Sequence, residues 1–249
     1  MRIAVLNDIH GNLPALEAVL EEVRGAGVDR IVVGGDVFPG PMPHQVMRRL
    51  QNAGPPVEFI YGNGDVVVRE QLEGKRPARL PEAYLPMVKW NAEQLDASER
   101  DAIASWPMTL RIDVPPLGDV LFCHATPRNE NEIFTHVTGE DRLIPVFDAA
   151  GAAVVVCGHT HMQFERMVGR TRVINAGSVG MPFGPAGADW LVLGPGVDLR
   201  HTMYDLEAAA ERIRRSGYPG AEEFAAKYVL NPPTAAEMLQ TYSGYELTP

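Results

Sequence analysis

Five short polar motifs, each directly after an apolar run, constrain the fold of this chain more than any other feature of its sequence. In chain order they are Asp8-Ile9-His10, Gly35-Asp36, Gly62-Asn63-Gly64-Asp65, His124 and Gly158-His159-Thr160-His161. Short apolar runs of this kind predict buried strands. Ligands of open α/β sheets gather beyond the carboxyl ends of the strands. We therefore expect the five motifs to lie at one such edge.

The side chains of these motifs are typical ligands of a site that holds two divalent metal ions. The motifs contain three Asp, one Asn and four His residues. Imidazole suits Zn, Fe, Ni and Cu, while carboxylate and amide oxygens suit Mn and harder ions, so the mixture favours Mn, Fe or Zn over Ca. Two ions about 3.5–4 Å apart can clamp the attacking and the leaving oxygen of an in-line displacement. Taken singly, each motif could equally be a turn or a helix cap, but five of them after strand ends favour the metal site.

Asp36 is the residue best placed to bridge two ions. It follows the apolar run 31–33 and two glycines, Gly34 and Gly35, so we expect it just past a strand end. Glycines let the backbone turn at such a place and let a ligand approach closely.

The hydrophobic periodicity predicts an α/β chain whose strands fall into two sets. Strands at 3–6, 31–33 and 57–61 alternate with helices at 13–23 and 44–52, which indicates a parallel sheet with covered faces. A helical segment follows at 66–105. Later strands are expected at 109–114, 120–123, 154–157, 164–168, 171–174, 190–193 and 199–204, with helices at 140–150, 206–215 and 221–229. The division into an earlier and a later set suggests two packed sheets with helices outside.

Composition narrows the classes of function. The chain has 249 residues, 45% of them hydrophobic, and a net charge of −10. The acidic balance disfavours a nucleic-acid partner. It does not disfavour a phosphate substrate, because bound metal ions would make the local potential positive.

With only two cysteines, the chain cannot form a disulfide framework. The start of the chain has no signal peptide pattern, and no apolar run is long enough to span a membrane, so we expect a cytoplasmic protein with no membrane partner. The sequence leaves the oligomeric state open.

In this order, the motifs resemble those of the calcineurin-like metallophosphoesterase family. The resemblance spans roughly residues 3–180, and the loop 175–180, Asn-Ala-Gly-Ser-Val-Gly, is similar to one in the compact bacterial and archaeal branch of phosphodiesterases and small phosphatases. It implies a four-layer αββα sandwich of two mixed sheets flanked by helices. We expect residues 1–249 to form a single domain of this kind, with a helical insertion around 66–106 and a helical C-terminal extension around 206–249.

The resemblance also implies a role for each motif residue. The first metal ion would be held by Asp8, His10, Asp36 and His161, and the second by Asp36, Asn63, His124 and His159. Asp36 would bridge the two ions together with a water or hydroxide, and that hydroxide would attack phosphorus. Asp36, Asn63 and His124 would act in catalysis by positioning the metals and the phosphate.

Gly64 departs from the family pattern. Many members have His between the Asn and the acidic residue of this motif, and that His is taken to protonate the leaving oxygen. With Gly64 there, no general acid is assigned, which favours substrates with good leaving groups such as phosphoanhydrides. We expect Gly64→His to help alkyl esters more than aryl esters, if the imidazole adopts the right rotamer.

Three further side chains are candidates for supporting roles. Asp65 is predicted to orient a metal-bound His from behind. Arg128 could clamp a phosphate bidentately or be a solvated loop arginine. Asn12 could face the substrate or cap the helix that follows. The remaining histidines are expected on the surface or in packing, at His44, His136 and His201.

Three functional hypotheses follow. The first is a two-metal hydrolase of small phosphorylated substrates, either nucleotide-derived (dinucleoside polyphosphates or cyclic nucleotides) or phosphomonoesters. The second is a metal-stabilised binding or scaffold protein with little turnover, which Gly64 keeps open. The third is a DNA nuclease, which the acidic balance disfavours.

Overall fold

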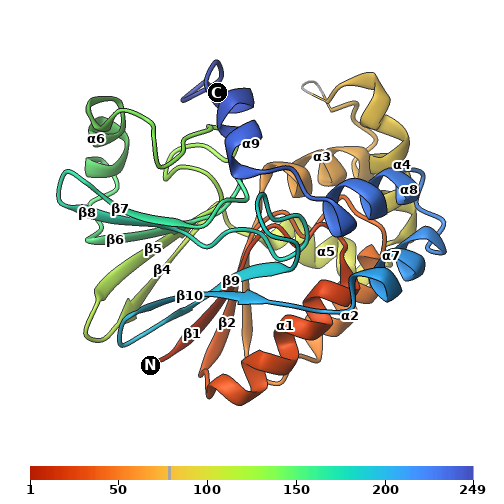
Figure 1. Cartoon of the computed structure of the whole chain (residues 1–249), viewed down its shortest axis with the longest axis horizontal. Helices are drawn as coiled ribbons and strands as arrows, with labels where there is room; N and C mark the ends of the chain where they lie inside the picture. Colours follow the sequence, from red (N-terminus) through yellow and green to blue (C-terminus); the bar gives the residue numbers. More distant parts are fainter. Residues whose placement is uncertain (78–79, 249) are drawn as a thin grey trace.

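The computed structural model describes residues 1–77 and 80–248 and contains two mixed five-stranded sheets (Figure 1). Sheet A has the order β10-β9-β1-β2-β3 and sheet B the order β4-β5-β6-β8-β7. The strands of sheet A are β1 (Ile3–Leu6), β2 (Arg30–Gly34), β3 (Val57–Ile60), β9 (Ala188–Leu193) and β10 (Val197–Thr202). Those of sheet B are β4 (Thr109–Val114), β5 (Gly118–Cys123), β6 (Val154–Cys157), β7 (Phe164–Val168) and β8 (Thr171–Asn175).

Sheet A begins with the predicted parallel β-α-β-α-β unit. Strands β1, β2 and β3 pair in parallel, and helices α1 (Leu13–Ala26) and α2 (Pro43–Gln51) connect them. Helix α1 begins as predicted, since Asn12 Oδ1 accepts a hydrogen bond from Ala15 N at 3.2 Å. It ends at Gly27, whose left-handed φ of 61° suits glycine.

The division into earlier and later strands is wrong for the last two. Strands β9 and β10 return to sheet A, where β9 pairs antiparallel with β1 in the register Ile3↔Leu193. The reason is burial on both faces: Leu191 and Leu193 join the core between the sheets, whereas Trp190 lies in the core under the helices. Without β9, the free edge of β1 would be left unpaired.

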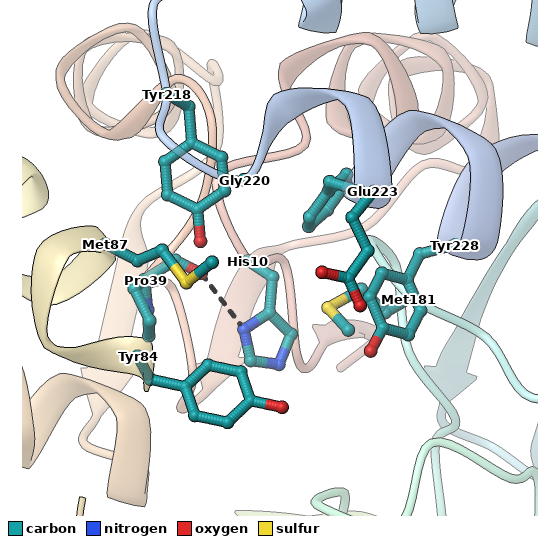
Figure 2. Close-up of a pocket in the computed structure, with 10 residues that line it drawn as sticks. His10, Pro39, Tyr84, Met87, Met181, Tyr218, Gly220, Glu223 and Tyr228 are labelled. Carbon is teal, nitrogen blue, oxygen red and sulfur yellow. Dashed lines mark hydrogen bonds between the residues drawn. The ribbon is translucent and has the colours of Figure 1, made fainter. Parts of the chain in front are cut away.

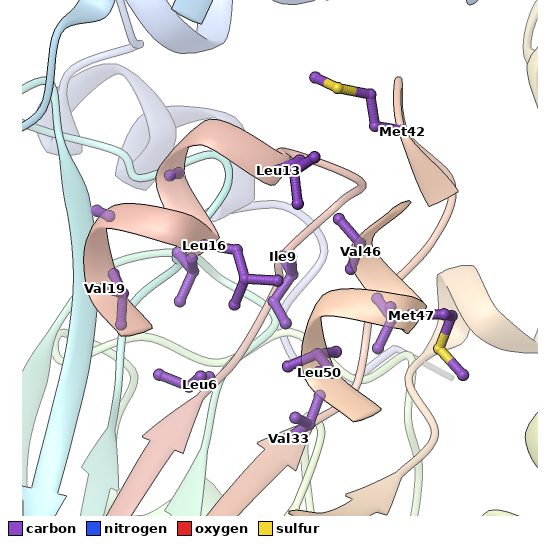
Figure 3. Close-up of a cluster of buried hydrophobic side chains, with 14 of the residues drawn as sticks. Leu6, Ile9, Leu13, Leu16, Val19, Val33, Met42, Val46, Met47 and Leu50 are labelled. Atoms are coloured by element: carbon purple, nitrogen blue, oxygen red, sulfur yellow. The ribbon is translucent and has the colours of Figure 1, made fainter. Parts of the chain in front are cut away.

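Side chains alternate between the two faces of each strand, so one hydrophobic core forms between the sheets and one forms between each sheet and its outer helices. The molecule therefore has four layers of secondary structure. On β1, Ile3 and Val5 point into the core between the sheets, while Ala4 and Leu6 point toward α1 and α2. Figure 3 shows Leu6 meeting side chains of both helices. Helix α6 (Glu140–Asp148) packs through Phe147 on the outer face of sheet B. The fold is therefore the αββα sandwich expected from the resemblance.

The remaining helices except α9 gather on the side of sheet A, and the residues after α9 reach α6 instead, where Arg142 donates to Glu246. Residues 63–105 contain α3 (Asn63–Leu72), η1 (Glu82–Tyr84), α4 (Leu85–Gln94) and α5 (Ala97–Ser105). The C-terminal part contains α7 (Leu206–Arg214), α8 (Ala221–Phe224), the π-helical turn η2 (Ala225–Leu230) and α9 (Ala235–Tyr242). In Figure 1, α8 lies beside α4, so segments distant in sequence become neighbours. Among the helices of residues 1–77 and 80–248, none is long and apolar enough to cross a membrane.

Candidate metal centre

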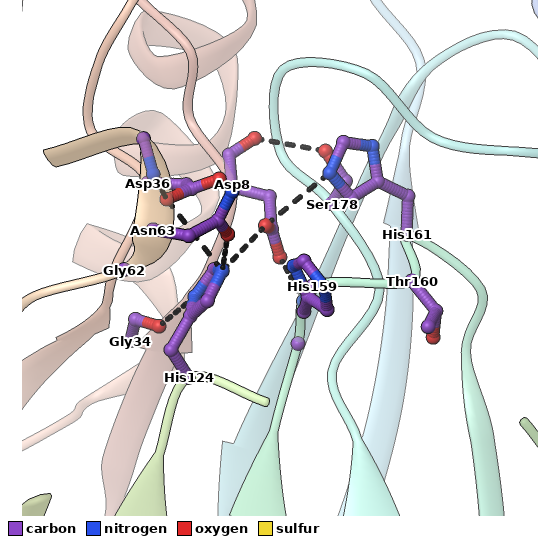
Figure 4. A network of polar contacts seen from close by, with 12 residues as sticks. Asp8, Gly34, Asp36, Gly62, Asn63, His124, His159, Thr160, His161 and Ser178 are labelled. Carbon is purple, nitrogen blue, oxygen red and sulfur yellow. Dashed lines mark hydrogen bonds and ion pairs between the residues drawn. The ribbon is translucent and has the colours of Figure 1, made fainter. Parts of the chain in front are cut away.

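The five polar motifs meet at the carboxyl ends of strands from both sheets (Figure 4). Asp8 follows β1, Asp36 follows β2 and Asn63 follows β3 as the first residue of α3, all in sheet A. His124 follows β5 and the His159–His161 turn follows β6, both in sheet B. Because each motif begins where its strand ends, the two sheets together deliver every ligand candidate to one edge of the sandwich.

The ligand candidates separate into two groups that share Asp36 as a neighbour. Within each group the ligand atoms lie within 4.8 Å of one another; the groups are Asp8, His10 and His161, and Asp36, His124 and His159. Asp36 Oδ1 lies 3.5 Å from His124 Nε2, and Asp36 Oδ2 lies 3.6 Å from His10 Nε2. Asn63 Oδ1 lies 3.0 Å from the same His124 nitrogen. One carboxylate thus directs one oxygen toward each group.

The backbone at this site is strained. Left-handed φ angles of 45–67° occur at five non-glycine residues of the motifs, namely Asp8, His10, Asp36, His159 and His161. Such conformations are uncommon for residues with a Cβ and cost of order 1–3 kcal/mol each. In the described part of the chain, only Leu247 shares this feature outside the site. Strain concentrated in one cluster points to a functional constraint on where these side chains lie.

Main-chain carbonyls orient three of the imidazoles. The Nδ1 atoms of His10, His124 and His161 donate to the carbonyls of Pro39 (3.3 Å), Gly34 (2.9 Å) and Met181 (2.8 Å), respectively. A neutral imidazole that donates from Nδ1 presents an unprotonated Nε2. This arrangement is typical of metal-bound histidines, in which the second nitrogen fixes the ring.

The electrostatics of the cluster fit a bound cation. Burial, together with His161, lowers the pKa of His10 to about 3, and burial, together with His124, lowers the pKa of His159 to about 3. Burial and the nearby Asp8 carboxylate raise the pKa of Asp36 well above its ordinary value. Neutral imidazoles are the protonation state that a divalent ion requires, and the raised pKa of Asp36 reflects buried negative charge that such a cation would offset.

Two local contacts support the same fit. Nε2 of His10 lies 3.3 Å from Nε2 of His161, so two unprotonated nitrogens would face each other with no donor between them. Asp8 Oδ1 is buried, lies 3.3 Å from His161 Nε2 and accepts no hydrogen bond. A cation would satisfy these three atoms together, because each offers a lone pair to the same space.

Glycine is required at position 64, where the resemblance would place the general acid. A Cβ added to Gly64 would lie 2.2 Å from the carbonyl oxygen of Phe38 and 3.0 Å from Asp36 Oδ1. Gly64→His would therefore need the main chain after β2 to shift before its imidazole could reach the site, because that main chain occupies the space for the Cβ.

Asp65 supports the site differently from the prediction. Its carboxylate accepts from the main-chain N–H groups of Asp36 (2.8 Å), Phe38 (3.1 Å) and Gly62 (2.9 Å), not from a histidine. Burial and the Asp36 charge raise the pKa of Asp65 to about 8. Asp65 therefore ties the loop that follows β2 to the loop that follows β3, and so positions Asp36 against Asn63.

We expect Asp65→Asn to weaken metal binding, because it disrupts the hydrogen bonds that join the two loops. An amide has one acceptor oxygen, so at least one buried N–H would lose its partner, at a cost of about 1–3 kcal/mol. Metal affinity should fall roughly 10–100-fold, as for other residues that hold ligands in place. Thermal unfolding and metal titration measure both effects, with Asp113→Asn on exposed β4 as the matched control. Unchanged affinity in Asp65→Asn would contradict the positioning role.

The two candidate substrate contacts are engaged elsewhere. Asn12 is fully buried, and its amide donates to Gly180 O at 2.9 Å in addition to capping α1, so the cap interpretation accounts for it. Arg128 forms a bidentate pair with Glu132, with distances of 3.0 Å from Nε and 2.7 Å from Nη2 to Oε1. Both side chains therefore have partners within the protein, and a contact of Arg128 with the substrate stays a prediction.

The loop 175–180 is hydrogen-bonded to the main chain of two segments that carry ligand candidates. Asn175 Nδ2 donates to Gly158 O at 2.6 Å, and Ser178 Oγ donates to Asp8 O at 2.8 Å.

The other histidines lie apart from the metal centre. His44 pairs with Glu99, His201 pairs with Asp189, and His136 is exposed. Both cysteines are buried and free.

A cavity of about 340 Å³ opens onto the centre, and sequence reasoning missed several of its residues. His10, Asp36 and Asn63 form part of its wall, and the rest includes Leu80, Tyr84, Met87 and Tyr218 from the helical parts of the chain and Asn131 from the loop between β5 and α6. No motif marks these residues. For Tyr84 and Tyr218 the sequence offers one signal, an aromatic side chain in a segment outside the predicted sheets, and for the others it offers none.

The chain resembles known proteins along most of its length. Residues 1–193 match the model of the calcineurin-like phosphoesterase superfamily domain. An uncharacterised protein of Methanocaldococcus jannaschii is 24% identical over 238 residues, covering 87% of this chain and 93% of that protein. The phosphodiesterase YfcE of Escherichia coli is 35% identical over 81 residues, which cover 29% of this chain and 44% of YfcE.

Solved structures share the fold. A hypothetical protein from Pyrococcus horikoshii superposes with a TM-score of 0.77 at 19% identity, covering 94% of this chain and 99% of that one. A metallophosphoesterase from Sphaerobacter thermophilus superposes with a TM-score of 0.71 at 24% identity, covering 92% and 99%. With its family match over residues 1–193, the chain belongs to the calcineurin-like phosphoesterase superfamily and is a phosphoric ester hydrolase.

Proposed function

We propose that this protein hydrolyses phosphate esters or phosphoanhydrides of small substrates with two divalent metal ions. The observation that carries the proposal is the position of Asp36, which directs one carboxylate oxygen toward each of two buried ligand groups. A scaffold protein would need neither a shared carboxylate nor a second group. The strained backbone at the ligand residues supports the same conclusion, because such strain persists where function requires a fixed geometry.

Each group would hold one ion, with Asp36 common to both. Asp8, His10 and His161 would complete the first set of ligands, and Asn63, His124 and His159 the second. The mixed nitrogen and oxygen donors favour Mn, Fe or Zn. When bound, two such ions stabilise negative charge on the transferring phosphoryl group and lower the pKa of water toward neutrality.

The residues of this chain would position the substrate rather than exchange protons with it. The N-terminus of the ten-residue helix α3 begins at Asn63, so its first N–H groups favour an anion at this edge. One of them, Gly64 N, already donates to Asp36 Oδ1 at 2.7 Å. The amide of Asn63 also carries an NH₂ group that can bond a phosphoryl oxygen.

With glycine at position 64, we expect activity to depend steeply on the leaving group. A positioned general acid contributes about 10²–10⁴-fold for groups that leave as poor anions. Phosphoanhydrides and aryl esters should therefore be cleaved much faster than alkyl esters. The test is a panel of monoesters, diesters and dinucleoside polyphosphates graded by leaving-group pKa, assayed with Mn, Fe, Zn and Mg.

Two controls sharpen this assay. A chelator should abolish hydrolysis, and restoring Mn should recover it. A flat dependence on leaving-group pKa would assign the proton donor to another residue of the cavity. Hydrolysis that persists in chelator would contradict the metal mechanism itself.

A further inference from the structure

A second cavity adjoins the metal centre and is largely apolar. It has a volume of about 180 Å³, and it shares His10, Pro39, Tyr84, Met87 and Tyr218 with the larger cavity. Its remaining lining includes Met181, Glu223, Phe224 and Tyr228. Figure 2 shows His10 at its base, between Tyr84 on one side and Tyr228 on the other. A ligand with one end at the metal centre can therefore extend into this space past His10.

Aromatic contacts hold part of the wall in place. The ring of Tyr218 lies edge-on to Trp90 at 5.5 Å and to Phe224 at 6.4 Å. Phe224 in turn meets Tyr228 edge-on at 5.6 Å. Rings packed in this way lose little freedom when a ligand binds, so they present a preformed surface for a flat, apolar group.

One acidic side chain adds polarity to this wall. The side chain of Glu223 is 64% exposed and lies 3.9 Å from Lys227 Nζ, so it is hydrated at the rim. Figure 2 shows its carboxylate directed toward Met181 and Tyr228. A carboxylate accepts hydrogen bonds and donates none. The pocket therefore suits a planar ring system with N–H donors on its edge better than a purely hydrocarbon group.

One wall of the pocket comes from a part of the chain beyond the matched domain. The metal-ligand candidates all lie within residues 1–193, which match the superfamily model. Tyr218, Glu223, Phe224 and Tyr228 lie beyond that range, on α8, η2 and the turn before them. Tyr84 and Met87 come from the helical segment between β3 and β4. Two separate segments, one inside the matched domain and one beyond it, thus converge beside one metal site.

We propose that this pocket is a nucleobase subsite, which binds the base of a nucleotide whose phosphate lies at the metal centre. The proposal rests on the proposed function and names its substrate class. The base stacks on the tyrosine rings, and the edge carrying N–H groups faces Glu223. Guanine presents two adjacent N–H donors on one edge, so a guanine nucleotide gains most from this carboxylate.

Equilibrium binding tests the subsite without turnover. The full chain is loaded with Mn and titrated calorimetrically with phosphonate isosteres of guanosine 5′-monophosphate and of ribose 5-phosphate, in which a P–C bond prevents cleavage. Stacking of one base on aromatic side chains predicts roughly 10–100-fold tighter binding of the nucleotide. Ribose 5-phosphonate reports the phosphate site alone, because it lacks only the base.

Variants of Tyr84 test whether its ring causes the tighter binding of the nucleotide. Tyr84 is 53% exposed, so Tyr84→Ala leaves the core intact; it should reduce the nucleotide advantage at least about fivefold while the ribose ligand binds as before. Tyr84→Phe should keep the advantage, and Glu223→Gln should weaken the guanine ligand selectively. Tyr245→Ala, at a tyrosine that is 62% exposed and does not line the pocket, is the matched control.

Two results would overturn the subsite. Equal affinity of the nucleotide and ribose ligands for the natural protein is one, and an undiminished nucleotide advantage in Tyr84→Ala is the other. If neither phosphonate binds the Mn-loaded protein, the phosphate site is absent, and the proposed function fails together with the subsite. Tight binding of ribose 5-phosphonate without a base effect leaves the hydrolase intact and removes only the nucleobase pocket.

Discussion

Asp36→Asn should remove most hydrolytic activity and weaken both metal sites. The amide keeps the shape of the side chain, but it loses the charge and one of the two acceptor oxygens that face the ligand groups. Loss of several kcal/mol of charge stabilisation in the transition state corresponds to a fall in rate on the order of 10³-fold. Elemental analysis of the natural protein, purified without chelator, should approach two metal ions per chain, and the variant should hold fewer.

Asp101→Asn is the matched control for this substitution. It makes the same chemical change on the exposed side of α5 and should alter neither activity nor metal content. Thermal unfolding of both variants separates a local effect from general misfolding. A metal content of zero in the natural protein, with hydrolysis intact, would refute the two-metal site.

Gly64→Ala should destabilise the protein and slow catalysis together. Its Cβ meets the Phe38 carbonyl at 2.2 Å, and the backbone there is fixed by Asp65. Overpacking of this kind costs about 1–3 kcal/mol, which lowers the Tm of a chain this size by roughly 2–12 °C. Because Gly64 N donates to Asp36 Oδ1, a shift of α3 also moves that carboxylate, and a misplacement near 1 Å can cost about 10²-fold in rate.

Gly25→Ala provides the comparison for Gly64→Ala. Gly25 lies in α1, and an added Cβ there meets nothing within 4 Å, so alanine should be neutral or stabilise the helix by up to about 1 kcal/mol. Gly64→His should behave like Gly64→Ala and leave alkyl esters poor substrates. A Gly64→His variant that folds normally and cleaves alkyl esters faster would show that the loop can yield.

Local patterns were enough to predict much of the fold. Apolar runs such as 3–6 and 154–157 became strands, and the motif residues lie at their ends. The strand assignments succeed because burial on both faces selects continuous apolar stretches whatever their neighbours are. The pairing of strands could not be predicted in this way. Strand β9 lies about 180 residues after β1 in sequence, and neither segment has a local pattern that predicts pairing with the other.

The sequence by itself determined which side chains can bind metal, because residue types and their places after strands are local properties. It also identified Gly64 as unusual. Only the tertiary structure revealed that the Phe38 carbonyl fills that space, that Arg128 is engaged by Glu132, and that Asp65 bonds main-chain amides. It alone joined Tyr84 to Tyr218 beside the metal centre. These facts depend on distances between segments far apart in the chain, and such distances are set by the packing of whole layers.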